Sequence, residues 1–172
     1  MNIQLLGIVL AISINSTHAM VAEGGGVNPD KIHAVDLKKS QSYIRDGLFV
    51  GGDAQTTDVN LKDIRFAKNK EYERLVMDFT GSAGRSPYFQ VDVSPEMSRL
   101  VVTVYGKVKL GFEPKLVAKA FAKSAFVERI ELLPQIETDR WTYSLTLKDS
   151  KRPQVEVFEL GAPTRAIIDL KP

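Results

Sequence analysis

The stretch RWTYSLTLK, residues 140–148, decides the fold class. Large apolar side chains occupy the odd-numbered positions 141–147, and hydroxyl side chains occupy the even-numbered positions 142–146. Successive side chains of a β-strand point to opposite faces, so this segment has one apolar face and one polar face. Such alternation is typical of a strand that is buried on one side only. The stretch therefore predicts a sheet with one wet face.

Further segments on both sides of this stretch have the same character. Each is short, rich in β-branched, aromatic or leucine residues, and bounded by turn residues. The predicted strands are Leu61–Phe66, Tyr72–Phe79, Tyr88–Ser94, Arg99–Tyr105, Val127–Leu133, Gln154–Leu160 and Thr164–Leu170. Between the fourth and fifth of these, Pro114 suits a first helical turn and good helix formers follow it. We therefore expect one helix over about residues 114–124, with Lys115, Lys119 and Lys123 on its outer side.

The strands on the two sides of this helix align with each other without gaps. Residues 61–106 match residues 127–172 at a constant spacing, which places Arg74 on Arg140 and Arg99 on Arg165. This pattern indicates an internal duplication. Because one sheet alone leaves an apolar face bare, we expect a mainly β fold. Its predicted form is two similar four-stranded sheets packed as a sandwich, with one connecting α-helix.

The N-terminus has the features of a secretory signal peptide. Residues 1–19 contain no charged side chain, and an apolar run over residues 5–14 is followed by polar residues and by Thr17-His18-Ala19, a small-residue cleavage site. A membrane anchor is the alternative, but the run is short for a bilayer. We expect cleavage, export to the periplasm, and a mature protein that is not integral to the membrane.

Residues 20–60 are irregular in composition. Glycine and asparagine punctuate the segment, from Gly24-Gly25-Gly26 to Gly51-Gly52. The segment is predicted to be a tether with little regular structure. Two patches within it, Ile32–Leu37 and Tyr43–Val50, are open to a second interpretation as short strands.

Composition argues against several function classes. The net charge of +2 is too small to indicate nucleic-acid binding by bulk attraction, and there is no cysteine. His33 is the single histidine after the predicted signal peptide, so neither a histidine-based triad nor a His/Cys metal site is expected. We expect no cofactor, no metal and no enzymatic activity.

Three sequence pieces resemble the AMIN family, the N-terminal domain of exported N-acetylmuramoyl-L-alanine amidases and secretins. The first is LKDIRF (residues 61–66) followed by YERLVMDF (72–79), and the second is PTRAIIDL (163–170). RLVVTV (99–104) is similar to a weaker copy of the second. The resemblance spans residues 61–172 and implies two symmetric four-stranded sheets. It also implies binding of peptidoglycan in the periplasm, with Arg74 and Arg165 as the arginines of the family pattern.

Six residues are candidates for ligand contact. Aromatic faces and guanidinium forks suit glycans and the carboxylates of their stem peptides. The candidates are Arg74, Tyr88, Arg99, Arg140, Trp141 and Arg165. A structural role is the favoured alternative for Trp141, as a core residue, and for the arginines, as ion-pair partners of carboxylates such as Asp78 and Asp169.

Two binding functions remain open from the sequence, and a hydrolase that uses a carboxylate pair such as Glu71 and Glu73 or Glu128 and Glu131 is the least favoured alternative. The first is a binding module that holds peptidoglycan or its stem peptides and so localises itself or a partner at the cell wall. The second is an envelope assembly factor that binds another protein through a sheet edge or through the helix.

Overall fold

The computed structural model describes residues 28–81, 84–94, 96–133, 139–148 and 151–172. The predicted signal peptide, residues 1–19, lies outside these ranges, and so does the first part of the predicted tether. The described chain is mainly β, as predicted, with strands in two sheets, the helix α1 (Pro114–Phe121) and a short 3-10 turn at Pro29–Lys31. None of its helices is long and apolar enough to cross a membrane.

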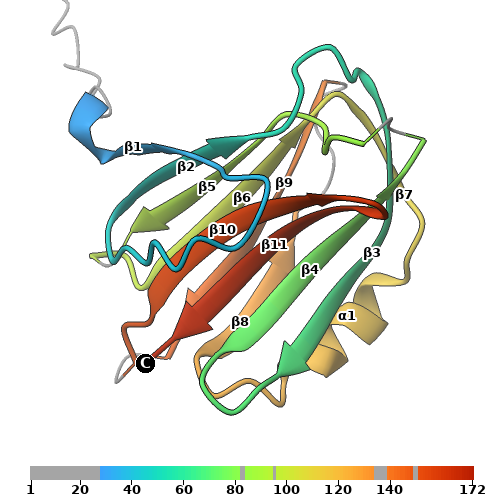
Figure 1. Cartoon of the computed structure of the whole chain (residues 1–172). Helices are drawn as coiled ribbons and strands as arrows, with labels where there is room; N and C mark the ends of the chain where they lie inside the picture. Colours follow the sequence, from blue (N-terminus) through green and yellow to red (C-terminus); the bar gives the residue numbers. More distant parts are fainter. Residues whose placement is uncertain (1–27, 82–83, 95, 134–138, 149–150) are drawn as a thin grey trace, which may run out of the picture.

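The strands form a sheet of six and a sheet of five (Figure 1). In spatial order, the six-stranded sheet contains β1 (Ile32–Ala34), β2 (Gly47–Gly51), β5 (Phe89–Ser94), β6 (Arg99–Tyr105), β9 (Arg140–Leu147) and β8 (Val127–Leu132). The five-stranded sheet contains β10 (Gln154–Gly161), β11 (Thr164–Lys171), β4 (Glu73–Thr80), β3 (Asp58–Lys68) and β7 (Lys107–Leu110). The expectation of four strands in each sheet is therefore wrong in number.

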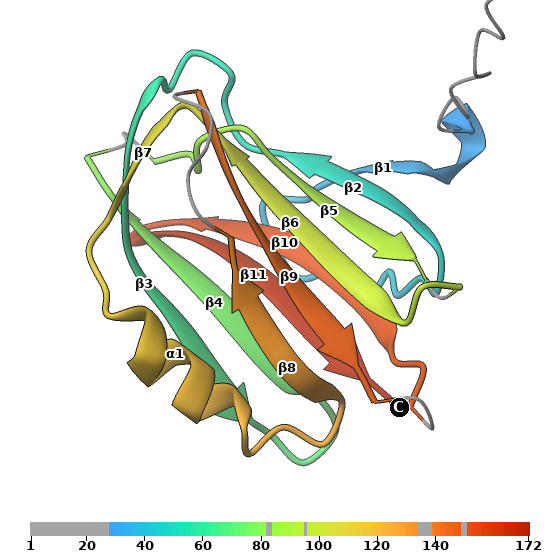
Figure 2. The ribbon, with the colours of Figure 1, turned by 180° about the vertical axis from the view of Figure 1, so that it is seen from behind.

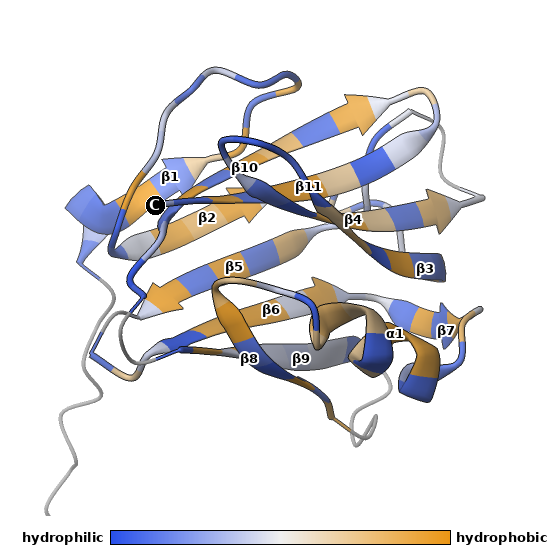
Figure 3. Cartoon of the chain, turned by 90° about the horizontal axis from the view of Figure 1, so that it is seen from below, coloured by the Kyte–Doolittle hydropathy of each residue, from blue (hydrophilic) through white to orange (hydrophobic). Residues whose placement is uncertain are grey.

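The two sheets lie as separate layers in Figure 3. Apolar side chains from both of them form one buried cluster, which includes Phe89 and Leu145 of the larger sheet and Met77 and Ile168 of the smaller. The alternation read from the sequence decides which side chains enter this core, because every second residue of each strand points inward. Trp141 is one of the inward residues and is 1% exposed.

Each half of the chain contributes one hairpin to each sheet. The β3–β4 and β10–β11 hairpins lie in the five-stranded sheet, whereas β5–β6 and β8–β9 lie in the six-stranded sheet. Strands β3 to β6 of the first half correspond in order to β8 to β11 of the second half. When each strand of the order β10-β11-β4-β3 is replaced by its counterpart, the result is β5-β6-β9-β8, which is the order in the other sheet. The duplication therefore does not make each half of the chain a sheet of its own. The observed exchange of hairpins instead gives both sheets contributions from both halves.

The halves align with a gap rather than without one. Ile64 pairs with Met77 across β3 and β4, and Ile130 pairs with Leu145 across β8 and β9. If Ile130 corresponds to Ile64, then Leu145 corresponds to Met77 and Thr142 to Arg74. The predicted match of Arg74 with Arg140 is therefore wrong by two residues. Its physical origin is the length of chain between the paired residues, because Ile130 and Leu145 are separated by two residues more than Ile64 and Met77.

The described part of the predicted tether belongs to the fold. β1 and β2 join the six-stranded sheet, and β3 begins at Asp58. Between β1 and β2, residues 35–46 form a strap that runs beside β10, with isolated bridges from Asp36 to Phe158 and from Ile44 to Val155. The strap covers the free edge of β10 and links the two sheets on that side.

On the opposite side, β7 and α1 link the two sheets. The chain leaves β6 of one sheet at Gly106 and enters β7 of the other, with Gly106 at φ 108°. A side chain there would place its Cβ 2.6 Å from the carbonyl oxygen of Thr57, so glycine is required at this crossing. α1 then packs Val117 and Phe121 into the core between β3 and β8.

Candidate binding face

The outer surfaces of the two sheets differ in kind. We call the outer face of the five-stranded sheet the closed face and that of the six-stranded sheet the open face. The strap runs beside β10 at the margin of the closed face, whereas no described segment crosses β5, β6 and β9 of the open face in Figure 2. The six candidate residues are divided between these faces and the core.

The closed face is occupied by its own ion pairs. Asp169 is fully buried and accepts hydrogen bonds from Arg74 Nε and Nη2 at 2.7 and 2.8 Å, and from Lys39 Nζ of the strap at 2.7 Å. Two parallel bonds from one guanidinium are the strongest arrangement for an arginine–carboxylate pair. The expected structural role of Arg74 is confirmed, and its fork is occupied by Asp169.

Arg165 is held in the same way on the closed face. Its Nε donates to Asp78 Oδ1 at 2.8 Å, and Arg65 Nη2 donates to the same oxygen at 3.0 Å. Burial alone would raise the pKa of Asp78, but the bonds from Arg65 and Arg165 outweigh burial and lower that pKa below 3.8. A buried apolar strip lies between the ion pair of Asp169 and the ion pairs of Asp78. It consists of Val76, Phe158 and Ile167.

Trp141 lies in the core and not on either face. Its indole Nε1 donates to the carbonyl oxygen of Leu133 at 3.0 Å, and its ring packs against Phe112 and Tyr143. The indole is therefore packed and hydrogen-bonded inside the protein, which confirms the core alternative over a ligand platform.

The open face presents a cluster of two tyrosines and a glutamine. The Tyr88 and Tyr105 ring centroids lie 5.0 Å apart. Gln90 joins the two phenols, because its Nε2 donates to the Tyr88 hydroxyl at 3.0 Å and its Oε1 accepts from the Tyr105 hydroxyl at 3.1 Å. An amide group has two donors and two acceptor lone pairs, so these bonds leave capacity for a ligand.

Hydroxyl side chains continue this polar surface across the neighbouring strands. Gln90 is in register with Thr103 of β6, and Thr103 is in register with Thr142 of β9. The two threonine hydroxyl oxygens are 3.2 Å apart. Thr146 continues this surface along β9, whereas Ser144, between Thr142 and Thr146, is only 3% exposed and departs from the predicted alternation of wet and buried positions.

Charged groups border the open face at both ends. Arg140 is exposed and in register with Tyr105. At the other end, Arg99 Nη2 lies 3.7 Å from Glu131 Oε2, which also accepts from Ser144 Oγ at 3.3 Å. The structure thus brings three of the six candidates, Tyr88, Arg99 and Arg140, to one face.

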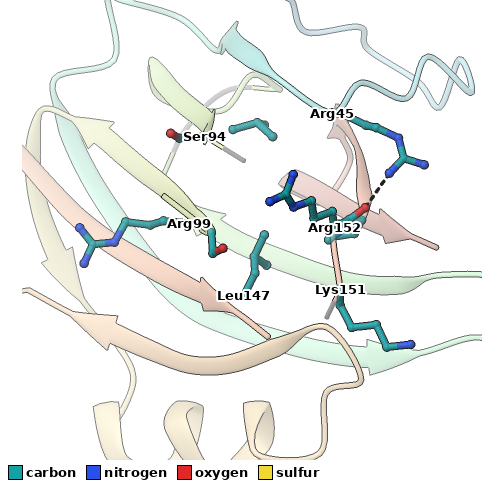
Figure 4. A pocket seen from close by; sticks show the side chains of 9 residues that line it. Arg45, Ser94, Arg99, Leu147, Lys151 and Arg152 are labelled. Carbon is teal, nitrogen blue, oxygen red and sulfur yellow. Dashed lines mark hydrogen bonds between the residues drawn. The ribbon is translucent and has the colours of Figure 1, made fainter. Parts of the chain in front are cut away.

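A cavity of about 240 Å³ opens beyond Arg99, at the end of the sandwich (Figure 4). Val93, Leu147 and Pro153 give it apolar walls, and Arg45 and Arg152 stand at its margin. Arg45 Nη1 donates to the Arg152 carbonyl oxygen at 2.9 Å, and the guanidinium groups of Arg45 and Arg99 point away from each other. Because its cations diverge, this cavity is a weaker candidate site than the open face.

The comparison with known proteins adds no family assignment. The chain matches no model of a protein family, and no curated protein sequence matches it.

Sequence reasoning missed Gln90, Thr103 and Thr142 as candidates for ligand contact. The available signal was the hydroxyl-rich polar face of residues 140–148, together with the alternation of Gln90 and Asp92 with buried valines. Neither signal shows which strands are neighbours, and neighbouring strands are what assemble the cluster.

Proposed function

We propose that this chain is an exported, non-catalytic module that binds peptidoglycan in the periplasm on its open face. The observation that supports this most is the contrast between the two faces. The guanidinium groups of Arg74 and Arg165 on the closed face are paired with carboxylates of the chain itself. The open face presents ring faces, an amide and hydroxyls, and no segment among the described residues covers them.

The chemistry of a glycan strand matches that surface. Sugar rings have apolar faces that pack on aromatic rings, and hydroxyl and acetamido groups that exchange hydrogen bonds with amides and hydroxyls. Tyr88 and Tyr105 supply the rings, and Gln90 with Thr103 and Thr142 supplies the polar partners. Arg140 and Arg99 at the ends suit the carboxylates of stem peptides. The resemblance to the AMIN family supports the same ligand.

A binding role without catalysis accords with the use of the buried carboxylates. Glu73 accepts from the amide of Ala125, Glu156 from the amide of Ser40, and Glu159 from the amide of Ser86. Each of these groups anchors a loop or a helix end of the chain itself. In the part of the chain that the structure describes, no three His, Asp or Glu side chains are grouped to hold a metal ion.

Co-sedimentation of residues 20–172 with purified insoluble peptidoglycan sacculi tests the proposal. We expect the protein in the pellet, and we expect it to stay there at about 0.5 M salt, where exposed charge attraction is largely screened. Tyr105→Ala is expected to weaken binding about tenfold. Tyr72→Ala removes a tyrosine that contacts Lys39 away from the open face and is the matched control. Protein that remains in the supernatant, or equal loss in both variants, would overturn the proposal.

A further inference from the structure

A groove runs between α1 and the outer edge of β3, which belongs to the sheet that does not carry the open face. Its volume is about 690 Å³. Its walls come from residues 62–67 of β3 with Val76 of β4, from the turn before α1, and from one side of α1. The lining includes Lys62, Arg65, Phe112, Leu116, Val117 and Ala120.

One wall of the groove is a strand edge without a partner strand. β7 pairs with β3 only from Asp58 to Leu61. The amide of Gly111 donates to the carbonyl oxygen of Leu61 at 2.9 Å, and the chain then turns away into α1. Among the strands that the structure describes, none pairs with residues 62–68 on this side. An edge of this kind presents main-chain donors and acceptors to another extended chain.

The other wall is apolar and is bordered by positive charge. Leu116 is 62% exposed, the largest exposure among the large apolar residues of the described chain. With 3.6 residues per turn, Leu116 and Ala120 lie between the buried side of α1 and its lysine stripe. Lys115 and Lys119 form the stripe on the helix, and Lys123 follows just beyond its end, since α1 stops at Phe121 and not at the expected residue 124. Within the lining, Asp63 and Glu113 balance Lys62 and Arg65, so the positive excess comes from the lysine stripe, which borders the groove without lining it.

We propose that this groove binds an extended segment of a partner protein, which adds as a strand to residues 62–68 of β3. The segment alternates apolar and acidic side chains. Main-chain hydrogen bonds to the β3 edge supply affinity, and alternate side chains supply specificity. The apolar side chains meet Leu116 and Phe112, and the acidic side chains are matched by Lys62 and the lysine stripe. This interaction is separate from glycan binding on the open face.

Fluorescence polarisation with labelled octapeptides tests the proposal. The first probe alternates Glu and Val, the second alternates Lys and Val, and the third is the first probe with its valine amides N-methylated. The Glu/Val peptide is expected to bind at least about tenfold more tightly than either of the other two, since each lacks the charge match or the main-chain donors. Hydrogen exchange of the amides of residues 62–68 is expected to slow when it binds.

Two variants locate the binding site. Leu116→Glu is expected to weaken binding of the Glu/Val peptide about tenfold or more, because it puts a negative charge in the groove. Leu37→Glu changes a leucine of the strap that is 59% exposed, close to the 62% of Leu116, and is expected to leave binding unchanged. Both variants are expected to sediment with sacculi like the parent protein, which keeps this test separate from that of glycan binding.

Several results would overturn the proposal. These are no saturable binding of the Glu/Val peptide, equal binding of the N-methylated peptide, or equal loss of binding in the two variants. Binding of phosphatidylglycerol vesicles that is lost in Leu116→Glu, with no peptide binding, would assign the groove to a lipid surface instead. Concentration-dependent dimerisation abolished by Leu116→Glu would assign it to a second copy of the chain.

Discussion

Arg74 lies opposite Asp169 across β4 and β11, and the two side chains form a doubly hydrogen-bonded ion pair. The corresponding positions of the six-stranded sheet hold Thr142 and Thr103, whose hydroxyl oxygens lie 3.2 Å apart. Equivalent positions of the two sheets therefore hold different pairs of side chains. On the closed face the pair is an internal ion pair, whereas on the open face it is a pair of uncharged hydroxyls that a ligand can reach.

Replacing Arg74 is expected to destabilise the fold strongly. Arg74→Ala leaves the fully buried Asp169 with Lys39 as its remaining cation, and losing one partner of a buried pair costs about 3–5 kcal/mol. Because Lys39 stays, we expect a loss of about 2–4 kcal/mol in urea unfolding. The control is Arg65→Ala, whose side chain is 47% exposed and whose loss is expected to cost less than about 1 kcal/mol. Equal losses in the two variants would contradict this account of Asp169.

The ion pairs of Asp78 are expected to make the free energy of unfolding fall at acid pH. The pKa of Asp78 in the folded protein is lowered by Arg65 and Arg165 against the effect of burial. A lowered folded pKa gives stability that is present above the unfolded pKa and is lost as pH falls through the folded pKa. We therefore expect the free energy of unfolding to fall as pH drops below about 4, and to fall less steeply in Asp78→Asn. Parallel curves for the two proteins would contradict the ion-pair origin.

Asp92 on the open face is expected to have the opposite effect. Burial, and then the charge of Asp46, raise the pKa of Asp92 above 3.8. A raised folded pKa gives stability that is present below the unfolded pKa and is lost as pH rises through the folded pKa. Asp92→Asn is therefore expected to stabilise the protein at neutral pH and not in acid. The gain stays below about 1 kcal/mol because solvent screens this exposed group. Thermal unfolding of the parent and of Asp92→Asn at neutral pH and in acid measures this gain. An unchanged or lower Tm of Asp92→Asn at neutral pH would refute the prediction.

Trp141 supports the core and is not expected to contribute to ligand binding. Since it is 1% exposed, its fluorescence is expected to resist quenching by acrylamide in the folded protein and to become accessible on unfolding. Trp141→Ala is expected to cost about 3–5 kcal/mol of stability. Trp141→Phe keeps a ring in the core and is expected to sediment with sacculi like the parent. Loss of sedimentation by a folded Trp141→Phe would return Trp141 to the binding face.

Local alternation in the sequence was enough to locate eight strands and the helix. Segments such as residues 140–148 bury one face regardless of which strands they pair with, so their faces can be predicted from sequence alone. β7 was missed because its four residues between Gly106 and Gly111 contain too few apolar positions to show a period. β1 and β2 fall in the patches Ile32–Leu37 and Tyr43–Val50, for which short strands were the second interpretation, and that interpretation is confirmed.

The exchange of hairpins between sheets was not predictable from the same pattern. Alternation reports which face is apolar and not which strand is the neighbour. The ungapped alignment of the halves also gave a misleading match. It places Arg74 on Arg140, two residues before the true counterpart, because it ignores the extra length of chain between β8 and β9. Only the observed register shows that Thr142 is the counterpart of Arg74.

An NMR titration of the isotope-labelled protein with soluble muropeptides tests most directly whether the open face is the binding face. The account predicts that amide shifts change at Tyr88, Gln90, Thr103, Tyr105 and Thr142, while those of Arg74, Asp78, Arg165 and Asp169 stay in place. Shift changes confined to the β4 and β11 residues, or no changes at saturating muropeptide, would contradict it.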